Sequence, residues 1–271
     1  AWYGSLIEVD NQSGYYLKLS GADHLSYASY PNVEFVEDLD YIDEYGNPDL
    51  YGTHYDVVDI NPTYTLGYGP NLFTYPNLED EFLTETLPEE LECSENSCLY
   101  AVLTPDGAYL CNPDGTWVGS NLTLNGYTGY WFKSSCEDDL EFEFNLPVEG
   151  VARAVTPEKE ILNGYEFNES SQYAFYFVKD LPQAQIGDWI IIMNDDVVVG
   201  AKKWTGSMID VPAMGNDGEA YSYGYLNPGD VPELMLYHSD TGALDPINCE
   251  IPGFINNEIF ILESLTDEDI A

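Results

Sequence analysis

The sequence is poor in positive charge. Its 271 residues include seven Lys and Arg against 49 Asp and Glu, which gives a formal net charge of -42 at pH 7. A protein of this charge repels phosphate backbones and anionic lipid surfaces. It also has no apolar run as long as a membrane-spanning helix requires. We therefore expect no nucleic-acid partner and no direct insertion into a membrane.

Sequence motifs for catalysis are also scarce. The three histidines, His24, His54 and His238, do not form a His-Glu-x-x-His motif, and no Gly-x-Ser-x-Gly motif occurs. Asp240-Thr241-Gly242 matches the triplet of aspartic proteases, but that chemistry needs two carboxylates and the triplet occurs once. A hairpin turn is the better interpretation of this triplet. We predict that the protein is not an enzyme; a secreted hydrolase has no supporting set of residues.

The apolar content predicts a folded protein despite the charge. Hydrophobic residues make up 44% of the chain and aromatic residues 14%, which is enough to fill a core. Short runs rich in Tyr, Val, Ile, Phe and Trp alternate with Gly, Asn, Asp and Pro, a pattern typical of β-strands and turns. The predicted strands are Gly14–Leu19, Tyr64–Leu66, Leu72–Tyr75, Tyr100–Leu103, Gly129–Lys133, Leu140–Phe144, Tyr173–Val178, Asp188–Met193, Val197–Ala201, Glu233–Tyr237 and Glu258–Leu262. One helix is predicted, over Glu79–Leu91, with Pro88 ending it. The expected fold is all-β: tandem β-sandwich modules with one short helix at most.

An internal repeat is the most informative feature of the sequence. At an offset of 115 residues, Trp2-Tyr3-Gly4-Ser5 aligns with Trp117-Val118-Gly119-Ser120, and Gly14-Tyr15-Tyr16-Leu17-Lys18 with Gly129-Tyr130-Trp131-Phe132-Lys133. The same offset pairs Ser20 with Ser135, Asp23 with Asp138, and Leu25 with Leu140. The pattern indicates a strand that starts with Trp, a loop, and a strand that starts with Gly, whose aromatic residues alternate between two faces.

The two copies of the repeat differ in length. A long β-rich segment precedes Trp117, whereas only Ala1 precedes Trp2. We expect residues 1–60 to hold the C-terminal half of a first module plus an acidic loop, and residues 61–147 to hold a second module. A linker over residues 148–159, a module of a second type over 160–265 and an acidic tail over 266–271 complete the expected organisation. The half-module would expose strand edges, which another segment or a second subunit must cover.

Cysteine usage favours an oxidising environment. No Cys-x-x-Cys motif occurs, so a zinc knuckle or a redox motif is disfavoured. Local pairing of Cys93 with Cys98 and of Cys111 with Cys136 is the preferred arrangement, which leaves Cys249 over; two bridges among five cysteines allow fifteen arrangements in all. Together with the acidity, this predicts a protein that is extracellular or at the cell surface. Asn11, Asn121 and Asn168 each begin a sequon for N-glycosylation.

Calcium is the one cofactor that the sequence suggests. Residues 38–49 place several oxygen donors around a Gly turn, as a hard cation prefers. The candidate ligands are Asp38, Asp40, Asp43, Glu44 and Asp49. The segment departs from the EF-hand pattern, so a solvated acidic loop is the alternative. Asn112–Gly115 and Asn216–Gly218 are weaker candidates, for which plain turns are the alternative.

Neighbouring aromatic residues raise the question of a glycan ligand. Tyr15 with Tyr16, and Tyr130 with Trp131, could stack on sugar rings. Adjacent residues of a strand point to opposite faces, so at most one of each pair can face outward. Packing in the core and between modules is the better explanation.

The motifs resemble those of β modules in large secreted proteins of marine bacteria. One module type is indicated by Asn71-Leu72-Phe73-Thr74-Tyr75-Pro76, Gly115-Thr116-Trp117-Val118-Gly119-Ser120 and Gly129-Tyr130-Trp131-Phe132-Lys133. The other is indicated by Gly187-Asp188-Trp189-Ile190, Asp210-Val211-Pro212-Ala213-Met214-Gly215-Asn216-Asp217-Gly218 and Gly229-Asp230-Val231-Pro232. Val198 stands where the family has Cys. The resemblance implies an extracellular protein of tandem β-sandwiches and brings no catalytic residue.

These observations predict a structural or adhesive protein. We expect a subunit of a surface fibre or layer that self-assembles through β-strand complementation and cations. The alternative is a carbohydrate- or ligand-binding module of a larger secreted protein. Subunits of this charge repel one another, so assembly would require strand pairing, salt or bound calcium to overcome the repulsion.

Overall fold

The structure is a computed structural model of the chain. It describes residues 61–77, 80–104, 107–120, 122–125, 128–146, 160–263 and 265, together with the backbone of residues 33–37 and 53–57. The strand predicted at Gly14–Leu19, the first copy of the repeat, the expected linker and the acidic tail lie outside these residues. Two strands, β1 (Val33–Glu37) and β2 (Thr53–Val57), form an antiparallel pair.

The fold is all-β with one short α-helix, as the sequence predicts. Residues 61–146 hold β3 (Tyr64–Leu66), β4 (Gly69–Thr74), β5 (Glu81–Phe82), α1 (Leu83–Thr86), η1 (Glu89–Leu91), β6 (Leu99–Thr104), β7 (Gly107–Cys111), β8 (Trp117–Gly119), β9 (Thr123–Leu124), β10 (Gly129–Ser134) and β11 (Leu140–Phe142). Residues 160–265 hold β12 (Tyr173–Val178), β13 (Trp189–Asn194), β14 (Val197–Lys203), β15 (Ile209–Met214), η2 (Ala220–Ser222), β16 (Glu233–Tyr237), β17 (Leu244–Pro246) and β18 (Ile259–Leu262). We call these two segments the first and the second unit.

The predicted helix over Glu79–Leu91 is much shorter in the structure. It is reduced to α1 and the 3-10 turn η1. Leu87, between them, has extended backbone angles of φ -73° and ψ 133°. Pro88 follows it, and the residue before a proline is sterically disfavoured in the helical region. The proline therefore divides the segment, as well as ending a helix.

An aromatic core fills the first unit. Its main sheet has the order β4-β10-β6-β7-β8, and the pairs β11-β3 and β5-β9 flank it. Rings of Tyr64, Phe73, Phe132, Phe142 and Phe144 contact one another with centroids 5.2 to 6.3 Å apart. Such edge-to-face and offset contacts add to the stabilisation that burial provides.

The second unit has two sheets around a common core, the arrangement of a β-sandwich. One sheet has the order β15-β12-β18 and the other β14-β13-β16-β17. β12 pairs antiparallel with β15 and parallel with β18. All six residues of β12 and all six of β15 are buried. A strand with only one face on a core would alternate between buried and exposed residues, so a further layer covers this sheet.

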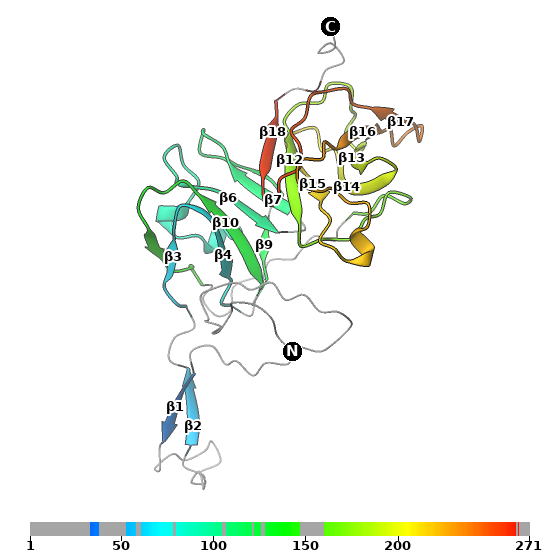
Figure 1. Cartoon of the computed structure of the whole chain (residues 1–271). Helices are drawn as coiled ribbons and strands as arrows, with labels where there is room; N and C mark the ends of the chain where they lie inside the picture. Colours follow the sequence, from blue (N-terminus) through cyan, green and yellow to red (C-terminus); the bar gives the residue numbers. More distant parts are fainter. Residues whose placement is uncertain are drawn as a thin grey trace.

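That layer is the main sheet of the first unit. Ala101, Leu103, Ala108 and Leu110, from β6 and β7, belong to the same buried cluster as β12, β15 and the second sheet of the second unit. We call this cluster the shared core. β10 connects the two cores, because Tyr130 and Phe132 face the aromatic core while Trp131 packs on the shared core. Figure 1 shows β7 lying beside β12 and β15.

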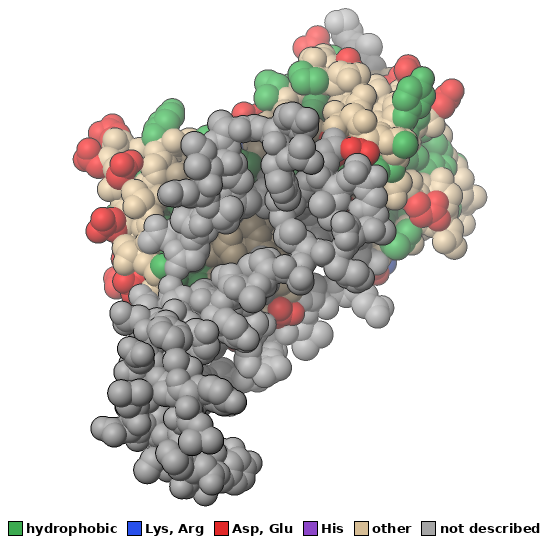
Figure 2. All heavy atoms as spheres, turned by 60° about the horizontal axis from the view of Figure 1, so that its bottom comes forward, with side chains coloured by type: hydrophobic (Ala, Val, Ile, Leu, Met, Phe, Trp, Pro, Cys, Tyr) green, Lys and Arg blue, Asp and Glu red, His purple; other side chains and the backbone are tan. Residues whose placement is uncertain are grey.

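Carboxylate side chains lie on the outside of both units. On the face drawn in Figure 2 they lie dispersed over the described surface, with small apolar areas between them. Dispersed acidic groups repel one another less than a single cluster would. The charge of the chain is therefore compatible with the two buried cores.

Candidate functional site at the junction of the two units

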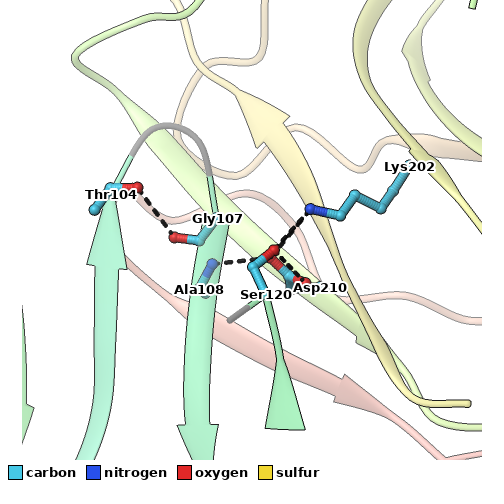
Figure 3. Close-up of polar contacts among 6 residues, drawn as sticks. All are labelled: Thr104, Gly107, Ala108, Ser120, Lys202 and Asp210. Atoms are coloured by element: carbon cyan, nitrogen blue, oxygen red, sulfur yellow. Dashed lines mark hydrogen bonds and ion pairs between the residues drawn. The ribbon is translucent and has the colours of Figure 1, made fainter. Parts of the chain in front are cut away.

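A buried carboxylate links the two units. Asp210 lies in β15 and is 1% exposed. Its Oδ2 accepts a hydrogen bond of 2.9 Å from the backbone N–H of Ala108 in β7. The hydroxyl of Ser120, which follows β8, donates to the same carboxylate, with Oγ 2.8 Å from Oδ2 and 3.0 Å from Oδ1. Figure 3 shows these contacts crossing from one unit to the other.

A lysine completes the network. Lys202 lies in β14, the strand that packs beside β15, and its Nζ donates to Ser120 Oγ at 2.7 Å. Nζ also lies 3.7 Å from Asp210 Oδ2. Ser120 therefore accepts from Lys202 and donates to Asp210. This network satisfies the buried carboxylate through partners from three strands or their ends.

Burial dominates the electrostatics of Asp210. Loss of water raises the pKa of its carboxyl above the usual value, and the charge of Lys202 and the hydrogen bonds from Ala108 and Ser120 offset the increase only in part. The environment thus disfavours the ionised form. A buried carboxyl group whose hydrogen-bond partners come from both units can link the sheets of the two units. The link holds as long as those partners keep their positions.

The absence of a side chain at Gly119 allows the end of β8 to lie close to β7 and to Phe177 of the second unit. Gly119 has φ +103°, and a Cβ on it would lie 2.4 Å from Ala108 O and 2.9 Å from Phe177 Cε1. Phe177 belongs to β12 of the second unit. A side chain at this position would therefore displace the second unit and strain the backbone.

Lys133 forms a second polar contact across the junction. It lies in β10 and is almost fully buried, and its Nζ donates to Glu258 Oε1 at 2.8 Å and to Asn257 O at 2.9 Å. Burial acts to raise the pKa of Glu258, but the hydrogen bonds from Lys133 and Ile259 N–H and the lysine's charge outweigh it, so the pKa is lowered. The Lys133 ammonium also lies 5.8 Å from the ring centroid of Tyr100.

The disulfide pairing predicted from local spacing is wrong. The bridges join Cys93 to Cys111 and Cys98 to Cys136, and Cys249 is free as predicted. Cys98 immediately precedes β6, and the Ser135 N–H that follows β10 donates to Cys98 O at 2.8 Å. Because β6 and β10 are antiparallel neighbours, the ends of these strands bring Cys98 beside Cys136. Strand pairing, which separation along the chain does not reveal, decides the connectivity.

The candidate calcium ligands Asp38, Asp40, Asp43, Glu44 and Asp49 lie outside the described residues. The two weaker candidates are turns. Asp114 Oδ1 accepts from Thr116 N–H and Oγ1, and Asp217 Oδ1 accepts from Glu219 N–H and Ser222 Oγ. Within the described ranges, no group of three or more His, Cys, Asp or Glu side chains is arranged to hold a metal ion.

The Asp-Thr-Gly triplet forms a hairpin turn, as the sequence predicts. The turn joins β16 to β17, with His238 N–H donating to Ala243 O at 2.9 Å and Gly242 N–H donating to His238 O at 2.8 Å. The ring of His238 lies between two carboxylates: Nδ1 is 3.4 Å from Asp188 Oδ2, and Nε2 is 3.2 Å from Asp245 Oδ2. His24 lies outside the described residues, and His54 lies in β2, of which only the backbone is described.

Asn168 is the one sequon asparagine among the described residues, since Asn11 and Asn121 lie outside them. Its side chain is exposed, whereas Ser170 of the same sequon is buried and donates to Gly215 O at 2.7 Å.

Of the aromatic pairs, Tyr130 is 2% exposed and Trp131 packs on the shared core, which confirms packing as their role. Tyr15 and Tyr16 lie outside the described part of the chain.

Comparison with known proteins adds no family. No protein-family model, curated protein or solved structure shows a significant match to this chain. Among the described residues, no helix is long and apolar enough to cross a membrane. The two disulfides are compatible with an extracellular protein.

The junction was not identified from the sequence as a site. Ser120 and Lys133 occur in the repeat, with Ser5 and Lys18 as their counterparts, but the repeat alone does not say what they bind. One feature of the sequence could have identified Asp210 as a buried site residue. It is the single charged residue in the otherwise apolar strand Ile209–Met214, and a charge in such a strand requires a buried partner.

Proposed function

We propose that this protein is an extracellular structural or adhesive component, a subunit of a surface fibre or layer. The observation that carries the proposal is the shared core, in which the two units pack as continuous layers. Units that move against each other in catalysis or ligand capture meet through smaller and more polar contacts. A continuous core held by Asp210 and Lys133 suits a part that transmits force.

The mode of assembly that we propose is β-strand complementation aided by cations. β18 is an edge strand of its sheet, and Ile261 within it is 48% exposed. An exposed edge can accept a strand from another copy of the chain. The net charge of -42 opposes such contact, so salt or divalent cations would have to screen it. The resemblance of the sequence to modules of secreted marine bacterial proteins supports the same setting.

A glycan-binding module is the second candidate. Tyr223 is 87% exposed and Tyr221 is 44% exposed, and both belong to the loop that contains η2. Exposed tyrosines offer flat rings for stacking against sugars. A glycan array with the wild-type protein and Tyr223→Ala tests this candidate: binding that the variant loses would support it, and no binding by the wild type would reject it.

Electron microscopy and sedimentation of the purified protein test the leading proposal. The protein is concentrated in low salt, in high salt and with calcium. We expect filaments or layers that form with salt or calcium and disperse when a chelator or dilution removes them. A chain that stays monomeric at high concentration in all three conditions would falsify the assembly proposal.

A further inference from the structure

A single Asp-Pro dipeptide occurs in the sequence, at Asp245-Pro246. Asp-Pro is the most acid-labile of peptide bonds. The aspartate side chain can attack its own main-chain carbonyl carbon and form a five-membered ring. The prolyl nitrogen is part of a tertiary amide and leaves as an amine once it is protonated. An Asp-Pro bond beside a proton donor therefore has the parts needed for cleavage of the chain.

The structure places a histidine against this carboxyl group. His238 Nε2 lies 3.2 Å from Asp245 Oδ2, and the Asp245 side chain is 65% exposed, so water reaches it. The other ring nitrogen, Nδ1, lies 3.4 Å from Asp188 Oδ2. Contacts to a carboxylate at both ring nitrogens hold the orientation of the imidazole.

Asp188 is held firmly enough to orient the ring. Its side chain is 5% exposed. It accepts hydrogen bonds from Gln185 N–H at 2.9 Å and from Ser239 N–H at 3.0 Å. Asp188 precedes β13 in the centre of its sheet, so a rigid element supports it. The charged groups that face His238 are thus Asp188 before β13 and Asp245 in β17.

The backbone on both sides of the Asp245–Pro246 bond is also fixed. On one side, His238 N–H donates to Ala243 O at 2.9 Å; on the other, Ile247 N–H donates to Leu234 O at 2.8 Å. Between them, Asp245 is paired with Leu236 and Pro246 with Met235. This pairing keeps the carboxyl group beside His238.

We propose that Asp245, His238 and Asp188 form a self-processing site that cleaves the Asp245–Pro246 peptide bond. A carboxylate oxygen of Asp245 forms a bond to its main-chain carbonyl carbon. The bond from that carbon to the Pro246 nitrogen breaks, and the nitrogen takes the proton given up by the His238 imidazolium. Residue 245 is left as a cyclic anhydride, which one water molecule opens to a terminal aspartate. The net reaction consumes one water, and nothing is oxidised or reduced.

The residues have distinct parts in this reaction. Asp245 supplies the nucleophile, and His238 contacts its reacting carboxylate and supplies the proton. Asp188 is a positioning residue, because it acts on His238 and does not touch the bond. The reaction occurs once per chain, is independent of the proposed function, and does not require a bound substrate.

Cleavage would leave the fold assembled. The C-terminal fragment, residues 246–271, contains Phe254, which is buried in the shared core, and β18, which pairs with β12. No disulfide crosses the cleavage point, since the bridges lie between residues 93 and 136 and Cys249 is free. The nicked protein would therefore remain one particle, with Pro246 as a new N-terminus, and would separate into two fragments on denaturation.

The test is incubation of the purified full chain at about pH 5, because acid promotes departure of the prolyl nitrogen as an amine, and at neutral pH. Mass spectrometry is run under native and denaturing conditions. We expect a native particle heavier by one water and, after denaturation, fragments 1–245 and 246–271, formed faster at the acidic pH. The same chain held unfolded in urea at the same pH measures the background lability of the bond. Cleavage of the folded chain that is no faster than this background would overturn the proposal.

Variants assign the roles. We expect His238→Gln to slow cleavage by about a hundredfold, the usual contribution of a general acid. Asp245→Glu, which would need a larger ring, and Pro246→Ala are expected to abolish it, whereas Asp240→Asn in the same turn leaves the rate unchanged. Asp188→Ala should slow cleavage, because the ring loses the oxygen that orients it, and Asp188→Asn, which keeps an oxygen there, should restore most of the rate. Equal rates in the wild type and the His238→Gln variant would reject the role of His238, and equal rates in the wild type and Asp188→Ala, or equally slow cleavage by Asp188→Ala and Asp188→Asn, would reject the positioning role.

Hydroxylamine tests the anhydride directly. Added during incubation, it should be captured at the C-terminus of fragment 1–245 as a hydroxamate. Cleavage that yields only the free acid in excess hydroxylamine would overturn the anhydride step. Circular dichroism of each variant checks that it is folded, so that a change in the cleavage rate does not result from unfolding.

Discussion

The carboxylate of Asp210 accepts a hydrogen bond from the backbone of Ala108, 102 residues earlier in the chain. This contact is buried, and it joins the edge strand β15 of the second unit to β7 of the first. It explains why Ser120 and Gly119 form one site with Asp210: the serine binds the carboxylate, and the glycine lets the strand come close enough. We expect substitutions at the junction to be poorly tolerated, and the predictions below concern the junction and the two disulfides.

Substitution of Asp210 separates its shape from its charge. Asp210→Ala leaves the Ala108 N–H and the Ser120 hydroxyl without their buried partner, and we expect the free energy of unfolding to fall by about 3 kcal/mol. Asp210→Asn keeps an acceptor for Ala108 and is expected to change stability by less than about 1 kcal/mol. Urea unfolding of the variants and the wild type measures both effects.

The difference in the free energy of unfolding between the wild type and Asp210→Asn also depends on pH. Burial raises the pKa of Asp210 above its unfolded-state value. The stabilisation from the protonated carboxyl is therefore complete below the unfolded-state pKa, and it is lost as the pH rises through the folded-state pKa. We expect the wild type to lose stability relative to Asp210→Asn between acidic and neutral pH. A relative gain over that range would contradict the direction of the shift.

Lys133→Met removes the ammonium and keeps the buried stem. We expect a loss of about 2 kcal/mol at neutral pH, because Glu258 and Asn257 O lose a charged donor. The pKa of Glu258 is lowered in the folded state, so its stabilisation is present above the unfolded-state pKa and is lost as the pH falls through the folded-state value. The difference in the free energy of unfolding between Lys133→Met and the wild type should therefore become smaller at acidic pH.

Lys179→Met is the matched control for Lys133→Met. Lys179 pairs with Glu263 at 2.6 Å, but both side chains are more than half exposed. Solvent screens such a pair, so we expect a loss of no more than about 0.5 kcal/mol. Equal losses for the two lysines would show that burial at the junction is not what makes Lys133 important.

Gly119→Ala is expected to lower the free energy of unfolding by about 3 kcal/mol, from a methyl group forced against Ala108 O and Phe177 together with a strained φ. Gly164→Ala is the control. Gly164 also has a positive φ, +89°, but no atom lies within 4 Å of its hypothetical Cβ. The Gly164→Ala variant should therefore lose only the free energy that backbone strain costs, about 1 kcal/mol. Thermal unfolding of both variants separates the two contributions.

Peptide mapping without reduction checks the disulfides. Cleavage after Glu95, Asp106 and Asp114 places Cys93, Cys98, Cys111 and Cys136 on four separate peptides. We expect the peptide with Cys93 to remain joined to the peptide with Cys111, and the peptide with Cys98 to remain joined to the peptide with Cys136. Alkylation before reduction should label Cys249 alone once the chain is unfolded. Removing the bridge between Cys93 and Cys111, which spans 18 residues, should cost about 3 kcal/mol. Cys249→Ser, which breaks no bridge, is the control.

Local patterns in the sequence predicted most of the strands. Tyr64–Leu66, Tyr173–Val178 and Glu233–Tyr237 begin and end where predicted, because each is a run rich in β-forming residues with polar or turn-forming residues on either side. β5, β7, β9 and β17 were not predicted, and neither was β15, which contains Pro212. Proline is tolerated there because β15 is an edge strand with β12 as its one hydrogen-bonded neighbour. Position within the sheet decides this, and a local pattern does not contain it.

The sequence by itself determined the class of the protein: its acidity, its β-rich pattern, the alternation of Tyr130 and Trp131 between two faces, and an odd number of cysteines. These properties follow from composition and from the two-residue period of a strand. Only the tertiary structure decided what each face meets. It placed Cys98 beside Cys136, Asp210 beside Ala108 and His238 beside Asp245, because contacts between strands depend on their order and register in the sheets.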